Sequence, residues 1–190
     1  MKFEKKNMMK HKIQNIDTIS KILNYQGKLP YQNLQISLCD NLIDEKGAQD
    51  IASDLVKCVN IISLNLSLHT NNIGEKGVQK LGTTFEKCSN FKSLAINLFK
   101  NLISNKGLSD FGSTMIKFSN IKILSLDFSQ NSIGEAGVLI LASGLKICNK
   151  ITTLTLNFKG INYQLSQLEW KVRFKVTKMK RLVVKKLIWC

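Results

Sequence analysis

The sequence predicts an α/β fold in which short parallel strands and helices alternate in a stack of repeats. The first observation is a period of 30 residues, marked by leucine at Leu34, Leu64, Leu94, Leu124 and Leu154. The second is that each leucine opens a short alternation of apolar and polar residues, which is typical of a strand with one buried face. The third is that the apolar residues switch to helical spacing after a glycine in the same unit. A strand followed by a helix is therefore expected in every unit.

The second unit shows the pattern clearly. Its buried strand positions are Leu64, Leu66 and Leu68, and its helical apolar positions are Val78, Leu81 and Phe85. We expect the helix to run from the acidic residue before the glycine, Glu75, to the lysine before the cysteine, Lys87. This order of charges suits the helix dipole.

A unit of this size cannot bury its own apolar face, so neighbouring units must stack. Parallel strands lie about 4.8 Å apart, whereas packed helices need about 8 to 10 Å, and the difference bends the stack. The sequence thus predicts a short horseshoe-shaped solenoid, with parallel strands on the concave face and helices on the convex face.

The motif LxLxLxxNxIGxxGVxxLxxxFxxC, read from Leu64 to Cys88, resembles leucine-rich repeats of the ribonuclease-inhibitor-like class over residues 31–160. The resemblance implies roles for two sets of periodic residues. Asparagine side chains would bind loop backbone between units at Asn41, Asn71, Asn101 and Asn131. Cysteines would lie at buried helix ends at Cys58, Cys88 and Cys148. The chain departs from the pattern by an extra LxL step in each strand, and by Asp44 and Ser104 in place of the first loop glycine.

The two ends of the repeat region are expected to form caps, because an open stack exposes core residues. Residues 31–160 hold about four to five repeats. Residues 1–30 are expected to form a basic cap, with a helix over residues 10–25. Residues 161–190 are expected to form a basic cap with a helix over 164–180 and a short edge strand over 182–187. An alternative interpretation makes 171–176 a strand, because Val172, Phe174 and Val176 alternate with basic residues.

The net charge of +15 is concentrated in the caps. Residues 1–30 carry +5 and residues 161–190 carry +7, whereas the repeats between them carry only +3. A cationic surface attracts acidic partners in a manner that depends on salt.

The outward strand positions form the predicted partner-binding face on the concave side. Its members are Gln35, Ser37, Asn65, Ser67, His69, Asn97, Phe99, Ser125, Asp127, Ser129, Asn157 and Lys159. Small polar residues dominate, and Phe99 is the one large anchor of the kind that interfaces favour. The alternative interpretation is an exposed sheet face with no ligand.

A second candidate site is a cluster of basic residues in the C-terminal cap. Its members are Lys171, Arg173, Lys175, Lys178, Lys180, Arg181, Lys185 and Lys186. Phosphates or an acidic protein surface match this chemistry. The alternative is a solvated cap whose lysines protect the end of the stack.

The sequence gives no indication of catalysis, a metal or a cofactor. The five cysteines form no CxxC pair, and Phe118 replaces the periodic cysteine in the third unit, which indicates a buried apolar role. His69 is the sole histidine of the repeats, and the periodic glycines lack the lysine and hydroxyl residues of a phosphate-binding loop. We expect a non-enzymatic protein without a membrane span or a secretory signal, and hence a cytoplasmic one, with the nucleus as an alternative.

The leading functional hypothesis is therefore a protein-interaction module that binds a macromolecular partner through the concave face. RNA or acidic-polymer binding through the basic caps is the alternative. A third hypothesis comes from the resemblance alone, because related horseshoes inhibit ribonucleases or activate small GTPases, but no residue of theirs can be matched here. The oligomeric state is left open.

Overall fold

Each 30-residue unit folds into a strand followed by a helix, in a computed structural model that describes residues 8–11, 32–57, 60–88, 90–118, 120–160, 171–172, 175–176, 179, 182 and 184–189. The strands are β1 (Met8–His11), β2 (Asn33–Ser37), β3 (Ser63–Ser67), β4 (Ser93–Asn97), β5 (Ile123–Asp127), β6 (Thr153–Asn157) and β7 (Val184–Ile188). The helices are α2 (Glu45–Leu55), α3 (Glu75–Lys87), α4 (Asn105–Thr114), the short 3-10 helix η1 (Met115–Lys117) and α5 (Glu135–Ile147).

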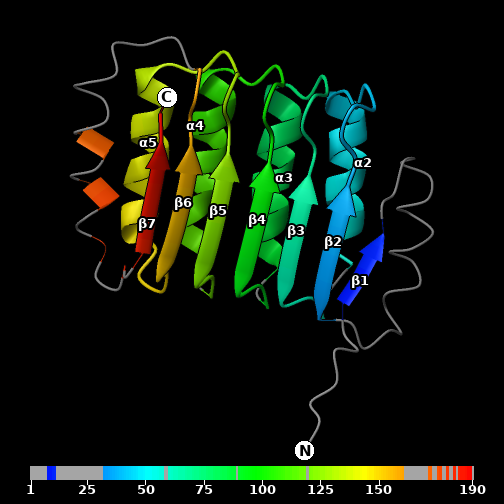
Figure 1. Cartoon of the computed structure of the whole chain (residues 1–190), viewed down its shortest axis with the longest axis horizontal. Coiled ribbons are helices and arrows are strands. Elements are labelled where there is room, and N and C mark those ends of the chain that lie inside the picture. The colour runs from blue at the N-terminus through cyan, green and yellow to red at the C-terminus, as the bar shows by residue number, and fades with distance from the viewer. Residues whose placement is uncertain are drawn as a thin grey trace, which may run out of the picture.

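The seven strands form one parallel sheet in the order β1-β2-β3-β4-β5-β6-β7. Helices α2, α3, α4 and α5 cover one face of this sheet, behind the strands in Figure 1. From β2 to β6 each residue pairs with the residue 30 positions further along, so that Leu64 pairs with Leu94 and Leu94 with Leu124. The predicted α/β architecture with a parallel sheet is confirmed.

The two terminal strands depart from the 30-residue spacing. Strand β1 pairs Met8 with Asn33, and β7 pairs Val184 with Thr153. Strand β1 shows no apolar alternation in its four residues and is not predicted by the sequence. The helix expected over 10–25 is wrong for Lys10 and His11, which lie in β1. The remainder of that helix, residues 12–25, lies outside the described residues. Strand β7 begins two residues later than the strand predicted over 182–187.

The structure of the C-terminal cap tests whether residues 171–176 are part of a helix or form a strand. Residues 171–172 and 175–176 are helical, so the strand interpretation is wrong for these positions. Val172 and Val176 are fully buried and lie four residues apart, on one face of the helix predicted over 164–180. They extend the apolar core beyond the last regular unit.

The core lies between the sheet and the helices and runs the length of the stack. The predicted inward positions Leu64, Leu66 and Leu68 are buried, and so are Val78 and Leu81 of the facing helix. Neighbouring units repeat this pattern, so each apolar layer contacts the next. Because stacking is what removes these side chains from water, it supplies most of the stability of the fold.

A ladder of buried asparagines joins the loops that follow the strands. The side-chain oxygen of Asn101 accepts a hydrogen bond from the Ile73 backbone N–H of the preceding unit (3.0 Å). Its amide nitrogen donates to the Leu68 carbonyl at 3.0 Å and to the Leu98 carbonyl. The Leu68 carbonyl also accepts a hydrogen bond from Asn71, at 2.9 Å. Asn71 and Asn131 make the same contacts in their own units. The role implied for the ladder is thus confirmed for these three residues.

The helix N-termini are capped differently in alternate units. Where the consensus glycine is replaced, the side chain itself caps the helix: Asp44 accepts from the Gly47 N–H at 2.8 Å and Ser104 from the Lys106 N–H at 3.2 Å. Where the glycine remains, the preceding helix supplies the acceptor. The Asn105 side-chain oxygen, for example, accepts from the Gly134 N–H at 2.8 Å. The departures at Asp44 and Ser104 therefore replace one cap with another.

Helices α4 and α5 approach each other closely at two glycines. A Cβ atom at Gly112 would lie 2.7 Å from the Leu141 Cα, and one at Gly144 would overlap the Gly112 carbonyl oxygen. Neither position has room for a side chain. The close approach of α4 and α5 leaves no space between the two helices near the 3-10 helix η1, which follows α4.

Replacing a ladder asparagine is expected to destabilise the fold. Asn101→Ala leaves the buried Ile73 N–H without its acceptor. The Leu68 and Leu98 carbonyls each keep a neighbouring asparagine as donor. We therefore expect the free energy of unfolding to fall by about 2 kcal/mol. Asn41→Ala is the matched control, because Asn41 is half-exposed at the start of the ladder and should cost about 0.5 kcal/mol. Urea unfolding followed by circular dichroism measures both, and equal losses would contradict the ladder's role.

Substitution at the helix–helix contact provides a second test of the packing. Alanine has a higher helix propensity than glycine by about 1 kcal/mol, yet Gly144→Ala should destabilise by about 2 kcal/mol because the methyl group meets backbone. Gly134→Ala is the control, since its Cβ would meet only the Asn105 side chain at 3.2 Å. Thermal unfolding of the two variants should show a much larger fall in melting temperature for Gly144→Ala than for Gly134→Ala, which loses only a favourable N-cap residue. A Gly144→Ala protein as stable as the parent would refute the close contact.

Candidate functional site

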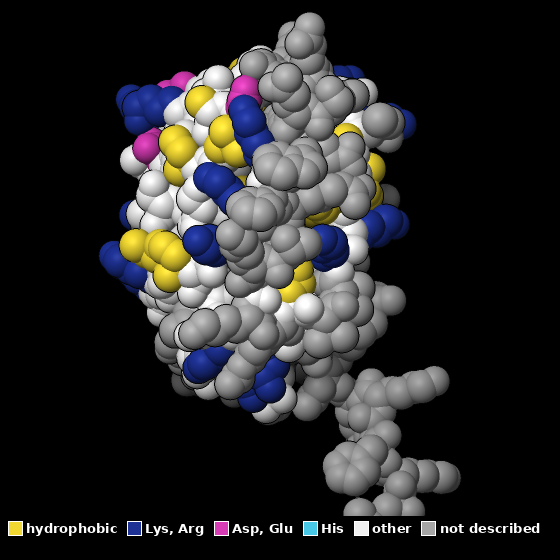
Figure 2. All heavy atoms as spheres, turned by 90° about the vertical axis from the view of Figure 1, so that its left-hand side faces the viewer, with side chains coloured by type: hydrophobic (Ala, Val, Ile, Leu, Met, Phe, Trp, Pro, Cys, Tyr) yellow, Lys and Arg dark blue, Asp and Glu magenta, His cyan; other side chains and the backbone are white. Residues whose placement is uncertain are grey.

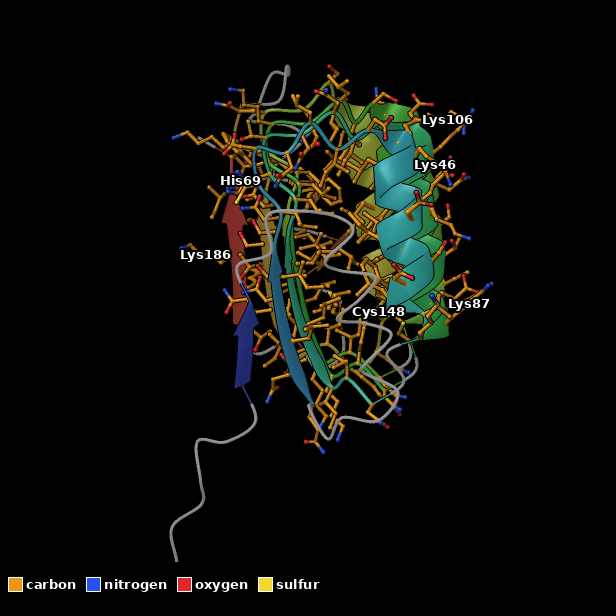
Figure 3. All side chains as sticks on the ribbon, turned by 90° about the vertical axis from the view of Figure 1, so that its right-hand side faces the viewer. Lys46, His69, Lys87, Lys106, Cys148 and Lys186 are labelled. Atoms are coloured by element: carbon orange, nitrogen blue, oxygen red, sulfur yellow. The ribbon has the colours of Figure 1, made fainter. Side chains whose placement is uncertain are left out.

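The face of the sheet that lies away from the helices is the candidate site, and we call it the open sheet face. It consists of the strand side chains that alternate with the buried ones, together with the residue two positions beyond the end of each strand from β2 to β6. Figure 3 shows His69 and Lys186 on this side of the sheet, opposite the helices that carry Lys46, Lys87 and Lys106. The predicted partner-binding residues of the strands are all half-buried or exposed, as expected.

Part of the open sheet face is occupied by hydrogen bonds to its own backbone. The side chains of Asn97, Asp127 and Asn157 each accept a hydrogen bond from the backbone N–H two residues further on, at 3.0, 2.9 and 3.1 Å. Such turns fix the direction in which the chain leaves the strand. These three predicted binding residues therefore have a structural role as well.

Ser129 is a correction to the predicted binding face. Its side chain is only 2% exposed, and its hydroxyl donates to the Asp127 carboxylate. The other carboxylate oxygen of Asp127 accepts from the Asn157 amide at 2.7 Å. Period-two alternation places Ser129 outward, but its hydrogen bond to Asp127 holds it against the loop, where a partner cannot reach it.

The central part of the face is free of such internal bonds. The side chains of Gln35, Asn65 and Ser125 lie on adjacent or nearby strands in the same row, and within the described residues they make no hydrogen bond. Ala95 lies between Asn65 and Ser125 and contributes only a methyl group to this row. This row offers unpaired amide and hydroxyl groups to a partner.

An aromatic pair lies at the end of the face where the strands finish. The rings of His69 and Phe99 meet edge to face with their centroids 6.4 Å apart, and both are half-exposed. The His69 ring also contacts the Thr70 hydroxyl at 3.2 Å. Among the described residues of the open sheet face these are the only two aromatic side chains, so they are its best anchors for a partner.

The described cysteines differ in burial, since Cys39 and Cys88 are partly buried and Cys148 is fully buried. Cys148 is buried and its thiol donates to the Met115 carbonyl at 3.0 Å, whereas Cys88 is half-buried. Burial raises the pKa of the Cys148 thiol to about 12 and that of Cys88 to about 11. Cys39 is half-exposed on the open sheet face beside the Ser37 hydroxyl. The buried helix-end position is thus confirmed for Cys148, while Cys58 and Cys190 lie outside the described residues.

The described part of the chain contains no cluster of three or more potential metal ligands. It also contains no helix with the length and apolar character needed to cross a membrane.

The basic cluster of the C-terminal cap is placed only in part. Lys171 forms an ion pair with Glu135 at 2.5 Å, and the Lys175 ammonium donates to the Ser143 hydroxyl at 2.6 Å, so both hold the cap against α5. Lys185 and Lys186 are exposed on β7. The remaining members, Arg173, Lys178, Lys180 and Arg181, lie outside the described residues. Figure 2 shows this end of the molecule, where the basic side chains of the described residues lie at separate places on the surface.

Comparison with solved structures finds proteins with a similar fold, of which two are described here. The chain is similar to the leiomodin-1 actin-binding site 2 structure, with a TM-score of 0.61, 12% identity, and 85% of this chain and 87% of that chain covered. It is also similar to the tropomodulin C-terminal domain from Caenorhabditis elegans, with a TM-score of 0.59, 10% identity, and coverage of 86% and 92%. No family model matches the sequence, and no curated protein sequence matches it. At these identities the likeness shows the fold alone.

The assignment to the ribonuclease-inhibitor-like class is therefore wrong. The structural neighbours are the tropomodulin and leiomodin domains, which share the alternation of strand and helix. The motif led to the wrong class because its leucine, asparagine and glycine positions are those that any stack of strand–helix units needs for burial and loop contacts. The periodic residues identify the architecture without distinguishing between the proteins that use it.

The different depths of the cysteines predict different thiol reactivity. The thiolate is the reactive form, and the raised pKa values of Cys88 and Cys148 keep both thiols protonated well above neutral pH. Iodoacetamide at pH 8 should therefore alkylate Cys39 first and leave Cys88 and Cys148 unmodified in the folded protein. Peptide mass spectrometry after timed quenching measures this order, with urea-unfolded protein as the control in which all three react. Rapid alkylation of Cys148 in the folded state would contradict its burial.

Proposed function

We propose that the protein is a non-enzymatic binding module whose open sheet face holds a protein partner. The observation that carries this proposal is the face itself: a wide sheet surface that no described helix covers, with free polar groups in one row and an aromatic pair at its end. In the proposed form the stack is a short curved solenoid, and the open sheet face is its concave side. A concave surface of small side chains around a few aromatic anchors suits the recognition of a folded partner.

The structural neighbours support a protein partner in general. The leiomodin-1 structure is that of an actin-binding site, so we propose actin as the first partner to test for this chain. Actin would also agree with the cytoplasmic location expected from the sequence. The proposal of a binding role without catalysis agrees with the surroundings of His69, whose ring contacts a threonine and a phenylalanine.

The binding face is tested by two substitutions that leave the core untouched. Phe99→Ala removes the larger anchor of the aromatic pair, and Ala95→Arg places a long cationic side chain in the middle of the free polar row. Each should weaken the complex with actin by roughly tenfold to a hundredfold, the range found for truncated or obstructed interface anchors. Co-sedimentation with filaments and fluorescence titration with labelled monomeric actin measure the affinity.

Ser113→Arg is the matched control, because it makes the same change of charge on the exposed side of α4. It should bind as the parent does. Loss of binding in the control as large as in Ala95→Arg would contradict the open sheet face as the site. If actin does not bind the parent protein, actin is excluded, and the same variants are then compared on partners captured by crosslinking to Cys39.

A further inference from the structure

The connections from each helix to the next strand all lie at one edge of the molecule, which we call the lower edge. They are residues 56–62, 86–92, 115–122 and 146–152, described except for 58, 59, 89 and 119. In Figure 1 the strands begin at this edge and the helices end there. The backbones of successive connections are joined in a row: the Lys122 N–H donates to the Lys92 carbonyl at 2.8 Å, and the Thr152 N–H donates to the Lys122 carbonyl at 2.8 Å.

The charge of the repeats is strongly polarised between the two edges. The lower edge carries seven lysines and Glu86 as its one acidic residue. The opposite connections, residues 38–46, 68–76, 98–106 and 128–136, carry four lysines and five acidic residues. The net charge of the repeat region is only +3, but its positive charge is concentrated at the lower edge. Figure 3 shows Lys87 at the lower end of the helices, away from Lys46 and Lys106.

Stabilisation of the helices accounts for only part of this charge. Lys87, Lys117 and Lys146 lie in the last turns of α3, η1 and α5, where a cation interacts favourably with the helix dipole. Lys92 and Lys122 lie beyond the helices, at the start of neighbouring strands, and their side chains are exposed. Within the described residues neither has an acidic partner, and their backbones are hydrogen-bonded neighbours. Like charges on neighbouring strands are unfavourable for folding, and neither a helix dipole nor an ion pair accounts for these two lysines, so they are candidates for contact with an anionic ligand.

Exposed aliphatic side chains lie among these lysines. Ile116 is 52% exposed and Ile147 is 60% exposed at the ends of neighbouring helices, and Val56 occupies a similar position after α2. Ile123, 47% exposed, follows Lys122 directly. Four of the seven large apolar residues that are exposed in the described part of the chain are thus on or beside the lower edge.

We propose that the lower edge binds the surface of an anionic lipid bilayer. Lysine ammonium groups match anionic headgroups, and the isoleucines between them are suited to enter the boundary between headgroups and acyl chains. The described residues of the lower edge have neither exposed aromatic side chains for base stacking nor arginine for phosphate recognition, which disfavours a nucleic acid. Lysine is depleted in protein interfaces, which disfavours a protein at this edge. The proposal is independent of the partner on the open sheet face.

The first experiment is co-sedimentation of the full chain with vesicles of phosphatidylcholine containing about one third phosphatidylserine. We expect binding to these vesicles at low salt, a steep loss as salt is raised, and no binding to vesicles of phosphatidylcholine alone. Absence of binding to the anionic vesicles would overturn the proposal.

The lower edge must then be separated from the basic termini, which also carry charge. The triple variant Lys87→Glu, Lys92→Glu, Lys122→Glu should lower the partition coefficient by roughly a hundredfold. The matched control is Lys76→Glu, Lys80→Glu, Lys100→Glu, which changes the net charge equally on other surfaces and should lose less than about threefold. Equal losses in the two variants would overturn the proposal, because binding would then follow net charge alone.

A third variant leaves the charge unchanged and so tests the choice of a bilayer. Ile116→Ser with Ile147→Ser should weaken vesicle binding about tenfold at any salt concentration, because it removes apolar area that enters the membrane. Full retention of binding would overturn the bilayer as the ligand. Tight binding of single-stranded RNA that the triple lysine variant abolishes, without vesicle binding, would assign the edge to nucleic acid instead. Circular dichroism and thermal unfolding of each variant establish that it is folded.

Discussion

Stacking of 30-residue units in register is the constraint on which the rest of the structure depends. No unit encloses its own apolar residues, so Leu94 is removed from water only because Leu64 and Leu124 lie on either side of it. The buried asparagines keep this register in the loops, since each one bridges the backbone of two units. Apolar burial supplies the driving force, and the asparagine ladder makes a shift between units costly, because it would leave buried backbone groups unpaired.

The same stacking gives each surface of the molecule a uniform chemistry. A position in the repeat that points outward in one unit does so in most of the others, with Ser129 as an exception, so its side chains form a row. The open sheet face arises in this way from the outward strand positions, and the lower edge from the helix-to-strand connections. The two surfaces differ in chemistry, since the first is polar and almost neutral whereas the second is cationic. Separate partners can therefore be held by separate surfaces of one fold.

Most of the architecture follows from the sequence because the period constrains it. Strand and helix positions were predictable from the alternation around Leu64 and the spacing from Val78 onward. Strand β1 was not predictable, because its four residues show no alternation. They form a strand by pairing with the edge of β2. The burial of Ser129 depends on a hydrogen bond to Asp127 that no spacing reveals. The polarised charge was also missed, because summing over residues 31–160 hides which side each connection occupies.

Hydrogen–deuterium exchange resolved by residue tests the stacking claim most directly. If the units stabilise one another, the strand amides of β3, β4 and β5 should be the slowest in the protein and should exchange together, through one opening with a single free energy. Ile73 and Ile103, whose N–H groups the ladder binds, should exchange in the same group. Independent exchange of each unit, or strand amides that exchange as fast as the surface loops, would contradict the account.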